Sequence, residues 1–259
     1  MDLGIAGKRA IVCASSRGLG RACAEALAAE GVELVVNGRD PERLEATAVE
    51  LREAHGVAVT AVAGDVTTTA GREALLAAEA DADILVTNNA GPSPGQFLGF
   101  EHEDWIDALE GNMVAQLMMI RALLPGMRER RFGRIVNVTS AMVTTPRATM
   151  TLSSGARAGL TAAVKGLSFE VAPDNVTINN LLPERFDTDR QLFMAQRVMD
   201  AEGVSYEEAR RRQEESIAAK RLGRPSEFGA MCAFLCSVHA GFVSGNNIHL
   251  DGGSYPALI

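Results

Sequence analysis

Two polar residues one helical turn apart, Ser153 and Arg157, stand in the stretch TLSSGARAG at positions 151–159 of this 259-residue chain. Residues four apart share one face of a helix, so a helix here would direct both side chains to the same place. A serine hydroxyl is a weak acid, and an arginine guanidinium stays protonated across the working pH range. The pair therefore predicts electrostatic stabilisation of a developing oxyanion rather than direct proton donation.

A glycine-rich turn lies near the N-terminus, where CASSRGLGRA spans positions 13–22. Gly18 and Gly20 stand between a probable strand and an alanine-rich helix, which lets a phosphate approach the backbone and the helix N-terminus. Tight packing of a strand against a helix is the alternative explanation. The context favours a dinucleotide phosphate site made of Ser15, Ser16, Arg17, Gly18, Leu19 and Gly20.

The end of the second probable strand indicates which form of the cofactor is bound. An acidic side chain there accepts the ribose 2′-hydroxyl of NAD, whereas an arginine pairs with the 2′-phosphate of NADP. Gly38 and Arg39 occupy this end, and Arg17 lies in the glycine-rich turn. Asp40 follows, and capping of the next helix is a sufficient explanation for it. The two guanidinium groups favour NADP(H).

Short runs rich in valine and isoleucine alternate with longer helical patterns along the chain, as in repeated βαβ units. Strands are expected at 9–14, 33–37, 57–62, 83–87, 134–139, 176–181 and 247–250, and helices at 18–31, 41–56, 103–130 and 151–171. We expect a single α/β domain over 1–259, a doubly wound Rossmann-type fold with a seven-stranded parallel sheet and helices on both faces.

A charged, helix-prone segment runs from about 187 to 223, after the sixth expected strand. Ligands of open α/β sheets bind at the carboxyl ends of the strands, so this segment would overhang the site. We interpret it as a substrate lid. A solvated helical hairpin on the surface is the alternative.

The composition argues against several other classes of protein. A formal net charge of −8 disfavours nucleic acid or an anionic membrane as the main partner. No apolar run reaches the length of a bilayer-spanning helix, and the first residues lack the pattern of a secretory signal. The four cysteines have neither metal-site spacing nor the density of a disulfide scaffold. The expectation is a cytoplasmic protein without a metal that acts on a small molecule.

Six further motifs occur in a fixed order. They are GDV at 64–66, NNAG at 88–91, EGNMVAQ at 110–116, IVNVTS at 135–140, INNLLPERFDTD at 178–189 and HLDGGS at 249–254. Together with the glycine-rich turn, they resemble the short-chain dehydrogenase/reductase family, particularly its members similar to 3-oxoacyl-(acyl carrier protein) reductases. The resemblance covers nearly the whole chain and implies the same fold.

The resemblance also implies roles for individual residues. Ser140 would bond the substrate carbonyl, and Asn112 would support a bound water in a proton relay. Thr188 would contact the amide or phosphates of the cofactor, and Asp65 would lie beside the adenine. The other cofactor contacts would come from Val66, Asn89, Ala90 and Gly91, with Arg157 at the ribose.

The chain departs from the family at three places. Cys13 and Ala14 replace the usual threonine and glycine of the phosphate turn, and Glu184 replaces a glycine. Ser153 and Arg157 occupy the positions of the tyrosine that gives the proton and the lysine that holds the ribose. Loss of general acid catalysis typically lowers a rate by about 10² to 10⁴.

Other side chains are weaker candidates near the site. The chain has two tyrosines, Tyr206 and Tyr255, and a surface role for the first and a packing role for the second are favoured over proton donation. Arg147 lies on the loop between Ser140 and Ser153, where it would meet an acidic group of a substrate or remain on the surface.

Two functions remain open. The favoured one is an NADP-dependent oxidoreductase that transfers hydride between nicotinamide and a carbonyl or secondary alcohol, such as a 3-oxoacyl thioester, with Ser140, Asn112, Ser153 and Arg157 as the catalytic residues. The alternative is a catalytically weak or inactive NADP(H)-binding sensor or scaffold. The resemblance further implies a homo-oligomer, a dimer or tetramer, in which the helices at 103–130 and 151–171 pair.

Overall fold

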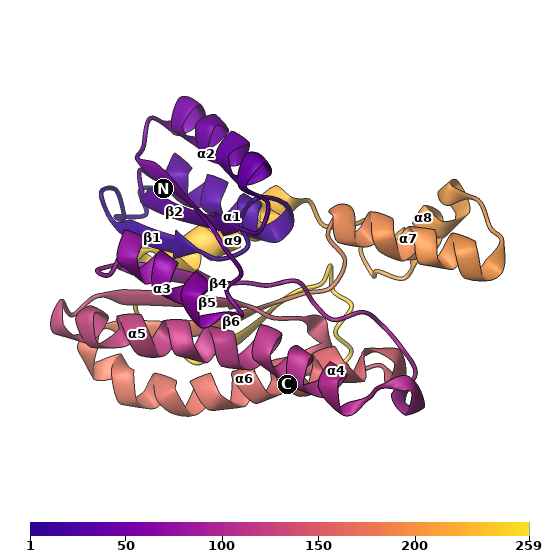
Figure 1. The fold of residues 1–259 in the computed structure, drawn as a ribbon. Helices are drawn as coiled ribbons and strands as arrows, with labels where there is room; N and C mark the ends of the chain where they lie inside the picture. The colour runs from indigo at the N-terminus through magenta and orange to yellow at the C-terminus, as the bar shows by residue number, and fades with distance from the viewer. Residues whose placement is uncertain (259) are drawn as a thin grey trace.

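A computed structural model describes residues 1–258 as a seven-stranded sheet between two layers of helices (Figure 1). All neighbouring strands are parallel, in the order β3-β2-β1-β4-β5-β6-β7. The strands are β1 (Arg9–Val12), β2 (Glu33–Gly38), β3 (Val59–Ala63), β4 (Ile84–Thr87), β5 (Gly133–Val138), β6 (Val176–Pro183) and β7 (Asn247–Leu250). The predicted doubly wound fold is confirmed.

Helices cover both faces of the sheet. One face packs against α1 (Gly18–Ala29), α2 (Pro41–His55) and α9 (Pro225–Cys236), and the other against α3 (Thr69–Ala78), α5 (Ala115–Glu129) and α6 (Thr151–Val171). The remaining helices are α4 (His102–Leu109), α7 (Asp189–Glu202) and α8 (Tyr206–Glu215). Within the described residues, no helix has the length and apolar character needed to cross a bilayer.

The central strands are apolar on both faces because both faces are covered. Ile11 and Val12 are neighbours in β1, and they point into different hydrophobic cores on the two sides of the sheet. All four residues of β4 are buried. The near-continuous apolar runs of the sequence thus follow from the position of these strands in the middle of the sheet.

The helix expected at 103–130 is interrupted, which corrects that prediction. A π turn, Glu110–Val114, separates α4 from α5, and the Ala115 N–H donates to the Glu110 carbonyl five residues earlier. The Gly111 carbonyl accepts the side-chain amides of Gln116 at 2.8 Å and Asn89 at 3.0 Å. These side-chain bonds stabilise a local geometry that apolar periodicity does not reveal.

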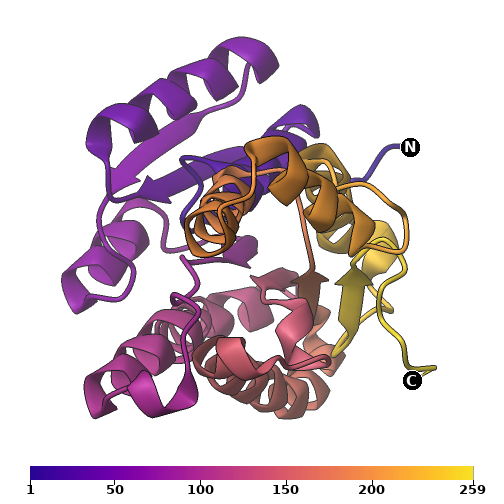
Figure 2. The same cartoon turned by 90° about the vertical axis from the view of Figure 1, so that its right-hand side faces the viewer.

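The segment expected at 187–223 forms a helical hairpin of α7 and α8. Figure 1 shows it projecting from the body of the molecule beyond the end of the sheet, and in Figure 2 it lies in front, facing the viewer. Its two ends are joined, because Phe186 pairs with Gly223 in a parallel bridge and the Asp187 N–H donates to the Gly223 carbonyl at 2.8 Å. The hairpin therefore starts at the carboxyl end of β6 and returns to the same place.

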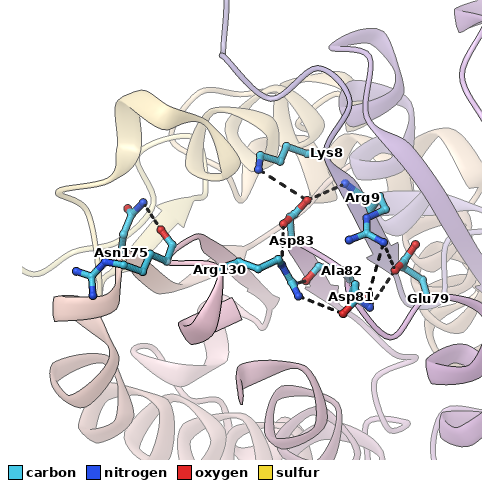
Figure 3. Close-up of polar contacts among 9 residues, drawn as sticks. Lys8, Arg9, Glu79, Asp81, Ala82, Asp83, Arg130 and Asn175 are labelled. Carbon is cyan, nitrogen blue, oxygen red and sulfur yellow. Dashed lines mark hydrogen bonds and ion pairs between the residues drawn. The ribbon is translucent and has the colours of Figure 1, made fainter. Parts of the chain in front are cut away.

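A polar network closes the amino edge of the sheet (Figure 3). The buried carboxylate of Asp83 lies 3.4 Å from Arg130 Nε and 3.9 Å from Lys8 Nζ, and it accepts the Arg9 N–H at 3.3 Å. Arg130 also bonds to the Ala82 carbonyl at 3.0 Å. The network joins the start of β1, the start of β4 and the residue after α5.

Candidate active site

The glycine-rich turn connects β1 to α1 at the carboxyl edge of the sheet. Gly18 has a φ of +60°, and a Cβ on Gly20 would lie 2.3 Å from the Ala14 carbonyl oxygen. Ala14 itself has a φ of 47°, in the left-handed region that favours glycine. Its carbonyl accepts from Asn88 Nδ2 at 3.2 Å, and its N–H donates to Asn37 Oδ1 at 3.2 Å. The turn therefore keeps a glycine-type conformation at an alanine.

Two residues assigned to the phosphate site are already engaged. Ser15 is fully buried, and its hydroxyl donates to the Val12 carbonyl at 2.7 Å and accepts the Asn37 N–H at 2.9 Å. Its side chain joins β1 to β2, and its expected contact with the cofactor stays a prediction. Arg17 Nη1 lies 2.8 Å from the carboxylate of Asp189 and ties the turn to the hairpin.

The end of β2 presents a cation without a competing carboxylate on the same strand. The side chain of Arg39 is 71% exposed. Asp40 caps α2 by accepting the Arg43 N–H at 3.1 Å, which is the capping role expected from the sequence. Gly38 leaves room for Ser16, whose hydroxyl would lie 3.0 Å from a Cβ at that position.

Asp65 follows β3 beside this strand end. Its carboxylate accepts the backbone N–H of Thr67 at 2.9 Å and the Thr67 hydroxyl at 2.8 Å, and it lies 3.9 Å from Arg39 Nη1. Burial opposes its ionisation, but these hydrogen bonds and the Arg39 charge outweigh burial and lower the pKa of the carboxyl. Val66 is buried behind it. Asp65 is thus an ionised acceptor.

The loop after β4 contacts the π turn. Asn89 donates to Gly111 and accepts the Ala90 N–H at 2.9 Å, which fixes the loop. Asn112 is buried in the π turn, and its Nδ2 donates to the Ala108 carbonyl at 3.3 Å. Its Oδ1 is buried with no hydrogen-bond partner among residues 1–258. An acceptor of this kind is suited to an ordered water.

Ser140 directly follows β5 and remains partly exposed. Its Oγ accepts the Met142 N–H at 3.1 Å, at the start of a short 3₁₀ turn. Because this bond uses the hydroxyl as an acceptor, its proton is free to be donated to a ligand.

Ser153 and Arg157 both lie on the buried face of α6. Arg157 Nη1 donates to the carbonyls of Val138 at 2.8 Å and Thr139 at 2.9 Å, at the carboxyl end of β5. Its Nε is buried and has no partner in the described part of the chain. A Cβ on Gly91 would lie 3.5 Å from its Nη2. The guanidinium thus stands between β5 and the loop after β4.

The charge of Arg157 is disfavoured but retained near neutral pH. Burial lowers the pKa of its guanidinium to about 10, and the nearby charge of Arg190 acts in the same direction. Arg157 is therefore a cation at pH 7 and a poor proton donor there.

Two residues after β6 approach the same edge. Thr188 is the residue before α7, and its methyl carbon would lie 3.9 Å from a Cβ on Gly18, which places it above the phosphate turn. Glu184 is nearly buried, 2.8 Å from Arg147 Nη2 and 3.6 Å from Arg185 Nε. The carboxylate that replaces the family's glycine is therefore compensated by two cations.

Sequence reasoning missed two arginines of the hairpin. Arg190 Nη2 donates to the Pro92 carbonyl at 3.1 Å, and Arg197 Nη2 donates to the Pro94 carbonyl at 3.5 Å. Both guanidinium groups lie near the ring of Phe193, 5.6 Å and 5.9 Å from its centre. Their spacing of seven on a helical segment was the signal that could have identified them.

The two tyrosines lie elsewhere. Tyr206 is the first residue of α8 on the projecting hairpin and is 43% exposed. Tyr255 stacks on His249 of β7 with ring centres 4.0 Å apart. Neither belongs to α6, which holds Ser153 and Arg157.

A groove with a volume of about 350 Å³ runs along this edge. Its lining includes Arg39 and Asp65 after β2 and β3, residues of the loop 89–94, and Asn112 and Leu152. The groove thus connects the strand end expected to bind a 2′-phosphate with the π turn that holds Asn112.

Known proteins are similar to this chain in both sequence and fold. The family model described as enoyl-(acyl carrier protein) reductase matches residues 13–255. The 3-oxoacyl-(acyl carrier protein) reductase FabG of Aquifex aeolicus is 32% identical over 98% of this chain and 100% of its own length. The NADPH-dependent reductase BacG of Bacillus subtilis is 31% identical over 97% and 99%. The crystal structure of L-sorbose reductase from Gluconobacter frateurii, complexed with NADPH and L-sorbose, matches with a TM-score of 0.94, 32% identity and full coverage of both chains. This chain belongs to the short-chain dehydrogenase/reductase family.

Proposed function

We propose that this protein is an NADP(H)-dependent oxidoreductase that acts on a carbonyl or secondary alcohol. One observation carries the proposal: the phosphate turn, Asp65, the loop 89–91 and Ser140 lie along a single edge of the sheet. The relative BacG is named as an NADPH-dependent reductase, and the L-sorbose reductase structure is a complex with NADPH, in agreement with this function.

The chain's own residues fit the cofactor. The positive φ of Gly18 and the missing side chain of Gly20 leave backbone N–H groups at the N-terminus of α1 open to phosphates. Arg39 ends β2, while Asp40 is used as a helix cap, so a 2′-phosphate would meet a cation there. Bound NADPH would supply the hydride.

The polar side chains near the carboxyl end of β5 would stabilise the reacting oxygen. Ser140 would donate a hydrogen bond to the carbonyl oxygen, and Arg157 would stabilise the negative charge that develops there. Ser153 would add a second hydroxyl from the same helix face as Arg157. Catalysis of this kind is electrostatic and does not require the missing tyrosine.

The proton would come from water. Asn112 Oδ1 and Arg157 Nε are buried acceptor and donor atoms without protein partners within residues 1–258. Ordered waters commonly satisfy such atoms. A water held by Asn112 is the source of the proton that we propose, in place of the phenol of the family.

The hairpin of α7 and α8 would act as the substrate lid over 187–223. It is tied to the phosphate turn by the pair Arg17 and Asp189 and to the loop after β4 by Arg190. A 3-oxoacyl thioester is one substrate consistent with the relatives named as 3-oxoacyl-(acyl carrier protein) reductases. The four buried free cysteines agree with a cytoplasmic, reducing location.

Association of two copies is supported by an apolar groove of about 510 Å³ on the outer face of α5 and α6. Leu117, Leu124 and Leu167 line it. Leu160 and Val164 of α6 are buried in the core beside the sheet. We propose a dimer or tetramer that uses this groove, which sedimentation of Leu124→Glu against the unaltered protein would test.

The decisive experiment follows NADPH absorbance at protein concentrations comparable to the cofactor, with a panel of 3-oxoacyl thioesters, diketones and quinones. We expect decay that Ser140→Ala reduces by about 10²-fold or more. Ser226→Ala, an exposed serine on α9, serves as the matched control. Quenching of NADPH fluorescence without decay for any carbonyl would instead support the sensor.

A further inference from the structure

The arginines of this chain divide into two groups. Most lie within ion-pair distance of a carboxylate. Within residues 1–258, those without such a pair are Arg121, Arg134, Arg157, Arg190 and Arg197. Arg121 is exposed on α5, and Arg134 is saturated by carbonyl groups at the amino edge. The other three gather at the carboxyl edge.

These three arginines converge on one short loop, 91–94. Arg157 approaches it from α6, with Nη2 next to Gly91. Arg190 and Arg197 approach it from α7, through the carbonyls of Pro92 and Pro94. Two helices that are distant in sequence thus present guanidinium groups to the same four residues.

The cluster is electrostatically unfavourable without a ligand. Burial lowers the pKa of both Arg157 and Arg190, and in each case the charge of the next arginine lowers it further. The buried Nε of Arg157 has no acceptor in the described residues. Guanidinium groups bind carboxylates and phosphates through short charge-assisted hydrogen bonds, so an anion would satisfy both the charge and the free donors.

The position of Arg157 relates this anion to the reacting carbonyl. Its Nη1 bonds to the carbonyls of Val138 and Thr139, the two residues that directly precede Ser140. The guanidinium of Arg157 is therefore held beside the strand end that Ser140 follows. This arrangement suits a short ligand whose anion lies close to its carbonyl.

We infer that Arg157, Arg190 and Arg197 form a subsite for the carboxylate of a short oxo-acid substrate. The inference rests on the proposed function and narrows its substrate class. A thioester carries no charge at this position, so an oxo acid is favoured over a 3-oxoacyl thioester. Phosphates of the cofactor share the same chemistry, but the strand end with Arg39 and the turn at Gly18 offer them sites of their own.

The test measures binding without turnover. Acetoacetate and methyl acetoacetate are titrated calorimetrically into protein saturated with NADP⁺, a complex in which both partners are oxidised and no hydride can move. We expect acetoacetate to bind at least tenfold more tightly than its ester. Arg190→Gln and Arg197→Gln should each raise the dissociation constant of acetoacetate by about ten- to a hundredfold, as expected for a lost charge-assisted bond.

Two controls separate the possible sources of the anion. Arg211→Gln removes a hairpin arginine already paired with Glu208 and Glu215, and it should change the affinity for neither acetoacetate nor its ester. The dissociation constant of NADP⁺ should stay unchanged in Arg190→Gln and Arg197→Gln. A rise in that constant alone would overturn the inference in favour of a cofactor phosphate. Equal binding of acid and ester, or binding of neither, would also overturn it.

Failure of the proposed function would look different. Tight acetoacetate binding without NADPH decay for any carbonyl would retain the anion subsite and exclude the reductase. Reduction of esters and thioesters with no preference for acids would retain the reductase and exclude the subsite.

Discussion

Two arginines without a carboxylate partner lie at opposite ends of β5, Arg134 within the strand and Arg157 on α6, and their hydrogen bonding differs. At the amino end, Arg134 is fully buried and bonds through all three nitrogens. Its acceptors are the carbonyls of Ser237 at 3.1 Å, Gly133 at 2.9 Å and Asn175 at 2.9 Å, and Asn175 Oδ1 at 3.3 Å. At the carboxyl end, Arg157 bonds to protein through Nη1 and leaves Nε unpaired within residues 1–258.

The difference extends along both edges of the sheet. The amino edge is closed by bonds within the protein, as the position of Asp83 between Lys8 and Arg130 shows (Figure 3). The carboxyl edge keeps buried atoms without protein partners, including Asn112 Oδ1. Thr177 Oγ1, near the start of β6, is also buried without a partner among residues 1–258, so such atoms are not confined to the carboxyl edge. An unsatisfied buried polar group costs about 1–3 kcal/mol, and Asn112 Oδ1 and Arg157 Nε are therefore atoms that a ligand or water would satisfy.

The largest effect is expected at the structural arginine. Arg134→Leu would remove hydrogen bonds to four acceptors, of which the Asn175 carbonyl keeps another donor, the Gly133 N–H, and it would lower the free energy of unfolding by about 3–5 kcal/mol. Urea unfolding measures this change. The activity per folded molecule should remain that of the unaltered protein, and Arg134→Lys should restore part of the stability. A specific loss of activity would remove the distinction between the two edges.

The functional arginine should show the reverse pattern. Arg157→Met removes a buried cation and the donor to two carbonyls, so we expect the free energy of unfolding to fall by about 1–3 kcal/mol, less than in Arg134→Leu. The value of kcat/KM should fall by about 10²-fold because a donor to the reacting oxygen is lost. Urea unfolding and steady-state kinetics on one preparation test both parts. A large loss of stability with normal kinetics would make Arg157 a second structural arginine.

The pH profile sharpens this assignment. Arg157 is charged below its pKa of about 10 and loses its charge as pH rises through that value. The contribution of its charge to kcat/KM should therefore persist to about pH 9 and fall roughly tenfold by pH 11. Burial disfavours the charged form of a lysine as well, so the decline in Arg157→Lys should begin at lower pH. A profile that Arg157→Lys leaves unchanged would count against the role of this charge.

The smallest effect is expected in the phosphate turn. Ala14 adopts a positive φ, so Ala14→Gly relieves strain but adds freedom to the unfolded chain, and stability should rise by less than about 1 kcal/mol. NADPH affinity, followed by fluorescence, should stay the same. Gly20→Ala is the contrasting variant, because its Cβ would lie 2.3 Å from the Ala14 carbonyl oxygen. It should weaken both stability and NADPH binding, and a tolerant Gly20 would show that the turn is not close-packed.

Much of the fold and part of the site were predictable from local patterns. The seven strands lie within a few residues of the expected ranges, because apolar runs and glycine-rich turns are read over short windows. The hairpin ends at the expected boundaries, where Phe186 pairs with Gly223. The π turn at 110–114 was not expected, because it depends on Asn89 from another loop as well as on Gln116. The bonds of the Ser15 hydroxyl to β1 and β2 were also not expected, because they depend on how the two strands pack together.

The sequence by itself determined the order of the elements and the family, and it placed Ser153 and Arg157 four residues apart. These follow from residue identity and short-range periodicity, which do not depend on distant contacts. Only the tertiary structure decided which arginines have all their nitrogens bonded within the protein and which keep donors for a ligand. Arg190 and Arg197 meet carbonyls 98 and 103 positions earlier in the chain, and Arg157 meets the strand end 18 and 19 positions before it. Hydrogen-bond satisfaction depends on which chain segments pack together, so it can be evaluated only in the folded protein.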